Sequence, residues 1–368
     1  MRTVNGGWPR YPRSRGLWSR RFWSRTLAAA VLASVPVTAG FTPGFLTPAL
    51  AQTPEQFYKG KTVDIVIGYS VGGGYDIYAR LIARHIGKHI PGNPTVVPKN
   101  MEGAGGMRLA NWLYGAAPRD GTVIGATSRA MAFEPLLGNK AAQYDPSRIT
   151  YIGSANDEVS VCMAWHTSGI ATFADVQARE LVVGANGVAD DTYQFSALLN
   201  NMFGAKFKMV QGYVGGTEIN VAMERTEVLG RCGFPWSTVK ATYPHWIKEK
   251  KFNLLMQFSL NKHPDLPDVP LVMDLATTQE QKQILTLIFG RQVMGRPYAA
   301  PPGVPKDRAD ALRRAFMATM VDKAFIADVE KAQFEITPVP GEKLEEMVMD
   351  IYRTTPPAVA AKAAAMVK

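Results

Sequence analysis

The chain has 368 residues, of which 46% are hydrophobic and 20% charged, a balance typical of a globular protein with about two domains. Its formal net charge is +10, but seven arginines lie within residues 1–51, which contain no Asp, Glu or Lys. Without that segment the formal charge falls to +3, and no Lys/Arg-rich run with interleaved aromatic residues stands out in the remainder. The composition therefore argues against a nucleic-acid partner.

Residues 1–51 have the organisation of a cleavable secretory signal peptide. The arginines precede an apolar run at 26–41, and Ala-Leu-Ala at 49–51 places small residues at the −3 and −1 positions. The run is short and is interrupted by Pro36 and Gly40, which disfavours the alternative of a membrane anchor. We expect cleavage after residue 51 and export of the remaining chain.

The first part of the remaining chain alternates between apolar segments and glycine-rich turns that open helices. A β-branched run at 61–70 predicts a buried strand ended by glycine. Isoleucine and leucine at helical spacing predict a helix at 76–90, with Asp76 as its N-cap. The further elements are two strands and a glycine turn that leads into a helix, at 94–100, 122–128 and 103–117. This order predicts an α/β domain with a mostly parallel sheet.

The same alternation restarts and predicts a second α/β domain. Its strands are expected at 159–165, 181–187, 207–216, 228–234 and 253–259. Its helices are expected at 173–178, 191–204 and 217–227. After a proline-rich turn, two long helices are expected at 306–332 and 341–355, and the residues that follow are expected to form a frayed tail.

Several common chemistries lack their sequence signatures. The first strand is not followed by the G-x-G-x-x-G of dinucleotide-binding folds, and the P-loop-like residues 60–62 precede that strand and lack the partner glycine. The sequence supplies no obvious nucleophile–base pair for covalent catalysis. His85 and His89 are four residues apart on one predicted helix but have no evident third metal ligand. We therefore expect no cofactor, no bound metal and no catalytic residues.

The two cysteines, Cys162 and Cys232, lie in apolar segments that are both predicted to be strands. In an exported protein such a pair can form a disulfide. Two buried free thiols are the alternative, and the sequence leaves both open.

Four short loops each follow a predicted strand and open a helix, at 68–76, 103–106, 184–192 and 212–217. In doubly wound sheets such loops gather at the carboxyl ends of the strands, where ligands bind. Each loop presents unpaired N–H groups at the positive end of a helix, which suits a carboxylate or a similar anion. Two α/β lobes that direct such loops into one cleft describe a solute-binding protein.

Six segments form a pattern spread over residues 54–350: "FYKGKTVDIVIGYSVGGGYDIYARLIARHI", "GNPTVVPKNMEGAGGMRLANWLY", "PRDGTVIG", "YVGGTEINVAMERTEVLG", "LPDVP" and "APPGVPKD". This pattern resembles the tripartite tricarboxylate transporter receptors, the Bug-type, TctC-like periplasmic binding proteins. The resemblance implies a type II-like, two-lobed α/β fold, in which each lobe is a mostly parallel sheet flanked by helices and strands cross between the lobes. We accordingly expect a signal peptide at 1–51, lobe I at 52–156 and 292–368, and lobe II at 157–291.

The resemblance also implies which residues hold the ligand. In lobe I they are Tyr69, Ser70, Val71, Gly72, Gly73, Gly74, Asp76, Gly105, Gly106 and Ser128. In lobe II they are Asn186, Gly187, Asp190, Asp191, Thr192, Tyr213, Gly215 and Phe234, within two stretches, 187–192 and 213–217, that face the cleft. Arg129 and Arg231 are candidates for counter-charge, with surface positions as the alternative reading.

The chain departs from the family pattern at two places. Tyr69 and Ser70 stand where the family often has two prolines, and Asp190 and Asp191 replace a Gly-Ser pair that usually has a histidine nearby. Two acids repel a dicarboxylate unless one is protonated or caps the helix. A ligand with one carboxylate and a distal amine, hydroxyl or amide fits as well.

The resemblance implies a monomeric periplasmic receptor, not an enzyme, that captures a small organic acid or amino-acid-like ligand. It would deliver this ligand to the permease subunits of a tripartite tricarboxylate-type membrane transporter. An exported enzyme on the same scaffold and a ligand sensor for a membrane signalling partner are the alternatives.

Overall fold

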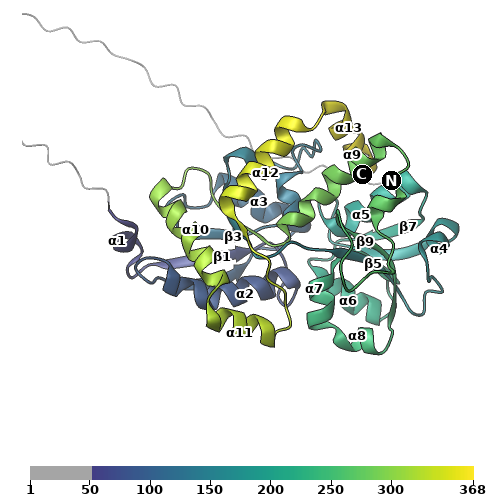
Figure 1. Ribbon diagram of the computed structural model, residues 1–368, viewed down its shortest axis with the longest axis horizontal. Coiled ribbons are helices and arrows are strands. Elements are labelled where there is room, and N and C mark those ends of the chain that lie inside the picture. Colours follow the sequence, from purple (N-terminus) through teal and green to yellow (C-terminus); the bar gives the residue numbers. More distant parts are fainter. Residues whose placement is uncertain (1–51) are drawn as a thin grey trace, which may run out of the picture. The chain divides into compact units, whose positions relative to one another are not determined.

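The computed structural model describes residues 52–368 (Figure 1), and the predicted signal peptide lies outside the described residues. After a short helix, α1 (Pro54–Tyr58), the chain enters a six-stranded sheet with the order β11-β4-β10-β3-β1-β2. The strands are β1 (Thr62–Ile67), β2 (Thr95–Asn100), β3 (Val123–Ala126), β4 (Thr150–Ser154), β10 (Pro297–Ala300) and β11 (Val339–Pro340). β1 pairs in parallel with β2 and β3, whereas β10 runs antiparallel to β3 and β4.

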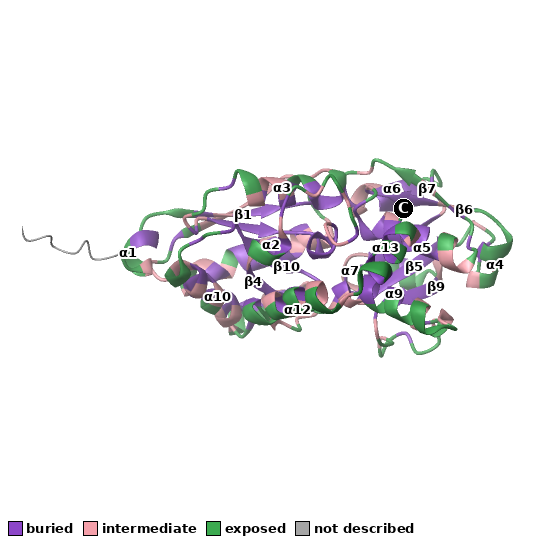
Figure 2. Ribbon diagram, turned by 90° about the horizontal axis from the view of Figure 1, so that it is seen from above, coloured by how far each residue is buried: buried purple, intermediate pink, exposed green. Residues whose placement is uncertain are grey.

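Alternate residues of β1 contact helices on opposite faces of this sheet. Ile65 and Ile67 belong to one hydrophobic cluster with α2 (Gly74–Ile86), α10 (Lys306–Met320) and α11 (Lys323–Lys331). Val66 belongs to another cluster, which includes buried residues of α3 (Met107–Gly115) and α12 (Gly341–Thr354). Helices therefore cover both faces of the sheet, as the two-residue period of side chains along a strand requires, and Figure 2 shows the strands as buried. We call this sheet and its helices the first lobe.

The second group of strands lies beside the first lobe (Figures 1 and 2). β5 (Ser160–Trp165) pairs antiparallel with β8 (Gly230–Pro235) and β9 (Phe252–Phe258). β6 (Leu181–Ala185) and β7 (Phe207–Gln211) form a parallel pair. The surrounding helices are α4 (Phe173–Ala178), α5 (Asp191–Phe203), α6 (Gly216–Glu224), α7 (Trp236–Thr242), α8 (Pro244–Lys248) and α9 (Gln279–Phe289). We call this group, with its helices, the second lobe.

The chain crosses between the lobes three times, from β4 into β5, from α9 into β10 and from α12 into α13. These crossings and the α/β composition of both lobes agree with the predicted fold class. The boundaries predicted for the lobes remain a prediction. None of the helices between residues 52 and 368 is long and apolar enough to span a membrane.

The C-terminal third of the chain departs from the sequence prediction in two respects. The helix predicted at 306–332 is two helices, because Asp322 accepts hydrogen bonds from the N–H groups of Ala324 and Phe325 and so caps α11 as a new helix. The predicted frayed tail is instead a helix, α13 (Pro357–Met366). Its alanine- and valine-rich face is buried, and it packs against α9 and α5. The tail is therefore ordered by apolar burial on the second lobe.

Cys162 of β5 and Cys232 of β8 are joined by a disulfide. The two strands are neighbours in the antiparallel part of the second-lobe sheet, and both cysteines are fully buried. The bond closes a chain segment with a sequence separation of 70 residues that contains β6, β7, α5 and α6. The disulfide therefore links the two ends of the chain segment that contains the loops before α5 and α6.

Candidate functional site

The first-lobe part of the site is the loop between β1 and α2. Helix α2 begins at Gly74 with Gly73 as its N-cap, so the prediction that Asp76 is the N-cap is wrong. Asp76 lies in the first turn, where its carboxylate accepts a hydrogen bond from the Gly72 N–H at 2.9 Å and pairs with Arg80 Nε at 2.9 Å. Burial raises the pKa of Asp76, but the hydrogen bonds from Arg80 and Gly72 outweigh it, so the pKa is lowered. Asp76 thus fixes the position of the glycine loop through the Gly72 N–H but does not line the cavity itself.

The second-lobe loop between β6 and α5 is organised by Asp190, the N-cap of α5. Its Oδ1 atom accepts hydrogen bonds from the Thr192 N–H at 2.9 Å and the Thr192 hydroxyl at 2.6 Å. Its Oδ2 atom accepts a hydrogen bond from the Tyr69 hydroxyl of the first lobe at 2.8 Å. Burial, and then the neighbouring charge of Asp191, raise the pKa of Asp190. Among residues 52–368, no cationic side chain forms an ion pair with this carboxylate.

The adjacent acid, Asp191, is enclosed between two buried arginines. Its Oδ2 lies 3.0 Å from Arg129 Nε and its Oδ1 lies 2.8 Å from Arg291 Nη2. Arg291 also donates to Gln194 Oε1 at 2.7 Å, and Arg129 donates to Gln292. Two guanidinium groups therefore neutralise the carboxylate of Asp191, so the acidic pair does not present two negative charges to the cleft. Arg291 was not anticipated from the sequence.

Arg231, in β8, is buried in the same cleft with 6% exposure. Its Nη1 donates to the Gly216 carbonyl at 3.1 Å and to Asn220 Oδ1 at 2.9 Å, and its Cζ lies 3.9 Å from the centre of the Phe234 ring. Burial lowers the pKa of Arg231 to about 10 despite the nearby charge of Asp190. No carboxylate in the described part of the chain forms an ion pair with it, and its Nε has no hydrogen-bond partner there.

Gly216 allows the Arg231 guanidinium to lie against the first turn of α6. A Cβ atom added at Gly216 would lie 2.5 Å from Arg231 Nη2 and 2.7 Å from Nη1. Any larger residue would therefore displace the guanidinium. The glycine is required here by close approach, and it places the cation beside the positive end of a nine-residue helix.

A further arginine, Arg296, has its charge already matched. Its Nη2 lies 3.2 Å from Glu158 Oε2 and donates to the Thr238 hydroxyl at 3.1 Å. Its Cζ lies 4.8 Å from the centre of the Tyr75 ring. Arg129, Arg291 and Arg296 thus each have a carboxylate partner, whereas Arg231 has none among residues 52–368.

Loops of both lobes surround a cavity of about 50 Å³ that lies between the two lobes. Contacts between the loops of the two lobes close it. Tyr69 donates to Asp190, and the Ser70 hydroxyl donates to Glu218 Oε2 at 2.9 Å. A volume of this size accommodates a few water-sized groups, since one ordered water needs roughly 10–15 Å³ on the same measure. The closed cleft is therefore shaped for a small ligand.

About half of the residues predicted to bind ligand line this cavity. They are Tyr69, Gly72, Gly73, Gly74, Arg129, Asn186, Asp190, Asp191, Thr192 and Phe234. Nine others do not line it: Ser70, Val71, Asp76, Gly105, Gly106, Ser128, Gly187, Tyr213 and Gly215. The assignment of the first set to ligand binding remains a prediction.

Most of the residues away from the cavity support the loops that line it. Ser70 lies against Gly215 across the cleft, whereas the side chain of Val71 is 64% exposed. Gly105 has a φ of 63°, and a Cβ atom there would lie 2.7 Å from Asp190 Cβ. The hydroxyl of Ser128 accepts a hydrogen bond from the Ala130 N–H at 3.2 Å and so caps a short helical turn.

The cavity also contains residues that the sequence did not single out. They are Tyr75, Asn220, Gly233, Pro235, Thr238, Tyr243 and Arg296. Pro235 ends β8 directly before α7, so the rule that ligand loops follow strands could have found this turn. Arg296 lies in the segment that crosses back to the first lobe, and no local sequence signal marks it.

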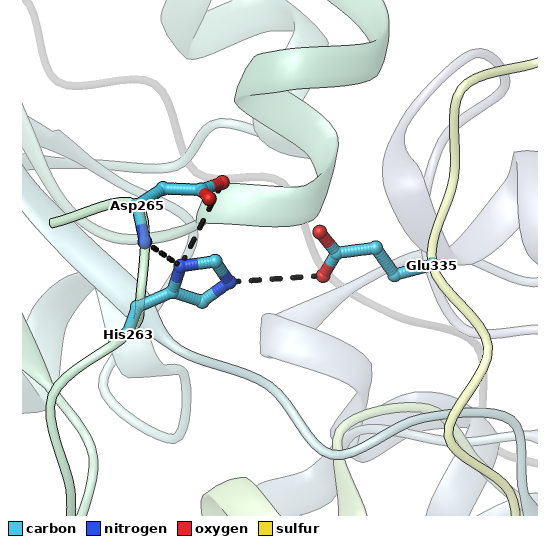
Figure 3. Close-up of side chains that lie close together, drawn as sticks. All are labelled: His263, Asp265 and Glu335. Atoms are coloured by element: carbon cyan, nitrogen blue, oxygen red, sulfur yellow. Dashed lines mark hydrogen bonds and ion pairs between the residues drawn. The ribbon is translucent and has the colours of Figure 1, made fainter.

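A second polar cluster, of His263, Asp265 and Glu335, has the residue types of a metal site (Figure 3). His263 Nε2 lies 3.8 Å from Glu335 Oε2, and the Asp265 N–H donates to His263 Nδ1 at 3.0 Å. The ammonium of Lys240 pairs with Asp265 at 2.6 Å and also with Glu335. A lysine therefore already supplies the positive charge, and the cluster links the second lobe to the segment after α11.

Comparison with known proteins agrees with this fold. No protein-family model matches the chain. A Cupriavidus necator protein described as "UPF0065 protein in gbd 5'region" is 24% identical over 311 residues, which cover 80% of this chain and 84% of that protein. The solved structure of the periplasmic binding protein BugD has a TM-score of 0.65 and 20% identity, over 84% of this chain and 97% of BugD.

Two solved structures of bacterial proteins with bound carboxylates are similar to the same extent. Rpa4515 of R. palustris, solved with adipate, has a TM-score of 0.63 and 18% identity, over 83% of this chain and 97% of that chain. MatC of Rhodopseudomonas palustris, solved with malate, has a TM-score of 0.63 and 17% identity, over 84% and 99%. The fold is therefore that of a two-lobed periplasmic binding protein. Within this class the chain is similar to the Bug-type, TctC-like receptors, which confirms the resemblance that the sequence motifs indicated.

Proposed function

We propose that the protein is a periplasmic receptor that captures a small organic carboxylate between its lobes and delivers it to a tripartite tricarboxylate-type membrane transporter. The observation that carries this proposal is Arg231, a buried cation in the interlobe cavity with no carboxylate partner among residues 52–368. A buried charge without a partner costs several kcal/mol, and a bound anion would offset that cost. The carboxylates bound in the similar structures, adipate in Rpa4515 and malate in MatC, support this ligand class.

The ligand carboxylate would meet the Nε and Nη2 atoms of Arg231 together with the N-terminal N–H groups of α2 and α6. The glycines at 72–74 line the cavity at the start of α2, and Gly216 and Thr217 line it at the start of α6. Helix N-termini favour anions because their first N–H groups have no partner within the helix. One helix comes from each lobe, so a bound anion would stabilise the closed cleft.

The proposal also covers the location of the protein, its oligomeric state and its partner in the membrane. The receptor would act as a monomer in the periplasm, exported by the signal peptide predicted at 1–51, and would dock on the permease subunits of its transporter. The similarity to periplasmic binding proteins supports the location. N-terminal sequencing of the protein recovered from a periplasmic extract tests the predicted cleavage after residue 51.

Calorimetry and thermal denaturation of the exported protein test the ligand class. We expect one family of small carboxylates to raise the melting temperature, with about 2.7 kcal/mol of stabilisation at a concentration 100 times the dissociation constant. The ligand should be recovered chemically unchanged after prolonged incubation. Absence of binding by every small carboxylate, or conversion of the bound compound, would contradict a receptor role.

A further inference from the structure

Four polar side chains of the cavity have hydrogen-bonding capacity that no described residue uses, and they form a donor group and an acceptor group. The donor group consists of Arg231 and Thr217, and the acceptor group consists of Asp190, whose Oδ2 accepts one hydrogen bond, and Asn186. All four side chains line the same cavity, and both groups lie on the second lobe. The presence of both groups in one small cavity restricts the chemistry of the ligand more tightly than a single anion site does.

The donor group presents an unused edge of a guanidinium. Both hydrogen bonds of Arg231 to the protein leave from Nη1, so its Nε and Nη2 atoms donate to no group among the described residues. These two atoms form the side of the fork that receives a carboxylate through two parallel hydrogen bonds. The hydroxyl of Thr217 is buried nearby, at the start of α6, and also has no partner in the described chain.

The acceptor group presents oxygen atoms and no cation. The amide nitrogen of Asn186 donates to Asp190 Oδ1 at 3.3 Å, which directs the amide oxygen away from the carboxylate. That amide oxygen is buried and has no hydrogen-bond partner between residues 52 and 368. Asp190 Oδ2 accepts one hydrogen bond, from Tyr69, and can accept a second. This end of the cavity therefore lacks a hydrogen-bond donor, preferably a positively charged one.

We propose that the ligand is a zwitterionic amino acid, whose carboxylate binds the Nε–Nη2 edge of Arg231 and whose ammonium group binds Asp190 and Asn186. This inference rests on the proposed receptor function and narrows its ligand class. One ligand would match both unpaired charges in the cavity at once. It would also supply the donor that the Asn186 amide oxygen lacks.

Other small carboxylates satisfy only part of this cavity. A dicarboxylate would place its second negative charge against Asp190, and like charges in a buried site repel strongly. A hydroxy acid would offer Asp190 a hydrogen bond from a neutral donor, without the charge–charge attraction that an ammonium group adds. A plain monocarboxylate would leave the acceptor group without a donor.

Titration calorimetry on the exported protein tests the inference. The panel consists of the common amino acids, β-alanine and 4-aminobutyrate, each measured beside the acid that lacks the amine and the matching hydroxy acid. We expect at least one amino acid to bind about tenfold or more tightly than both of its matched acids, which corresponds to about 1.4 kcal/mol. Succinate and malate serve as dicarboxylates in the same series.

Two variants assign the two ends of the ligand. Asp190→Asn keeps the helix N-cap, because asparagine caps as well as aspartate, but removes the negative charge. It should remove the preference for the amino acid over its matched acid. Arg231→Gln should weaken both. Asp175→Asn, at a partly exposed carboxylate that accepts a hydrogen bond from the Thr172 N–H at the start of α4, is the control and should bind as the wild type does.

The outcomes separate this inference from the receptor proposal. If a plain acid, a hydroxy acid or a dicarboxylate binds as tightly as every amino acid, the zwitterion inference is wrong and the receptor function stands. If Asp190→Asn keeps the preference for the amine, the assignment of Asp190 is wrong. If no compound in the panel binds, both the inference and the receptor proposal are overturned.

Discussion

Two substitutions in the same cavity should have opposite effects, because Arg231 and Asp191 differ in their partners. Arg231→Gln removes a buried cation that has no carboxylate partner among residues 52–368, whereas Asp191→Asn removes the shared partner of Arg129 and Arg291. The first change should weaken binding and spare the fold. The second should weaken the fold itself.

The expected magnitudes follow from burial and pairing. Truncation of one partner of a buried charge pair costs about 2–5 kcal/mol of binding, so Arg231→Gln should weaken the carboxylate complex by roughly 30-fold to several thousand-fold. Its effect on the unliganded fold should stay within about 1 kcal/mol, because an unmatched charge and two hydrogen bonds are lost together. Asp191→Asn leaves two buried guanidinium groups without a carboxylate and should cost about 3–5 kcal/mol of stability.

Guanidinium denaturation measures the free energy of unfolding, and calorimetry with the tightest-binding carboxylate measures affinity. Both variants should keep the wild-type dependence of unfolding on denaturant, so that shifts in the midpoint report stability alone. The reasoning is refuted if Arg231→Gln destabilises the unliganded protein as much as Asp191→Asn does. It is also refuted if Arg231→Gln binds the carboxylate with wild-type affinity.

Three further predictions concern the loop, the disulfide and pH. Asp76→Ala should weaken ligand binding by about 1 kcal/mol or more, because the glycine loop loses its anchor, and Asp76→Asn should weaken it less; unchanged affinity in calorimetry would remove this loop from the site. Replacement of Cys162 and Cys232 by alanine should cost about 2–4 kcal/mol in guanidinium denaturation, given the separation of 70 residues, and a change below about 1 kcal/mol would contradict this. Hydrogen bonding from His263 and Lys240 lowers the pKa of Glu335 from 4.5 to about 2. The stability that the Glu335 carboxylate contributes is therefore present above pH 4.5 and is lost as the pH falls to about 2. Glu335→Gln should flatten this part of the dependence of unfolding free energy on pH, and an unaltered dependence would refute the role given to Glu335.

The sequence determined the local order of strands, turns and helices, because this order depends on hydrophobic periodicity and on glycine at turns. The loops before α2, α5 and α6 were all expected, and each contributes residues to the cavity. Boundaries that depend on capping were less predictable. Asp322 interrupts a continuous helical pattern, and the N-cap of α2 is Gly73, three residues ahead of Asp76.

The tertiary structure alone decided which charges are matched. Asp190 and Asp191 are neighbours in sequence, yet one caps a helix without a cation and the other lies between Arg129 and Arg291. Those arginines are far from Asp191 in the chain and meet it only because the crossing segment and the first lobe converge at the cleft. Ion pairing falls off within a few ångströms and carries no local sequence signal, so the unmatched charge of Arg231 could be recognised only from the folded chain.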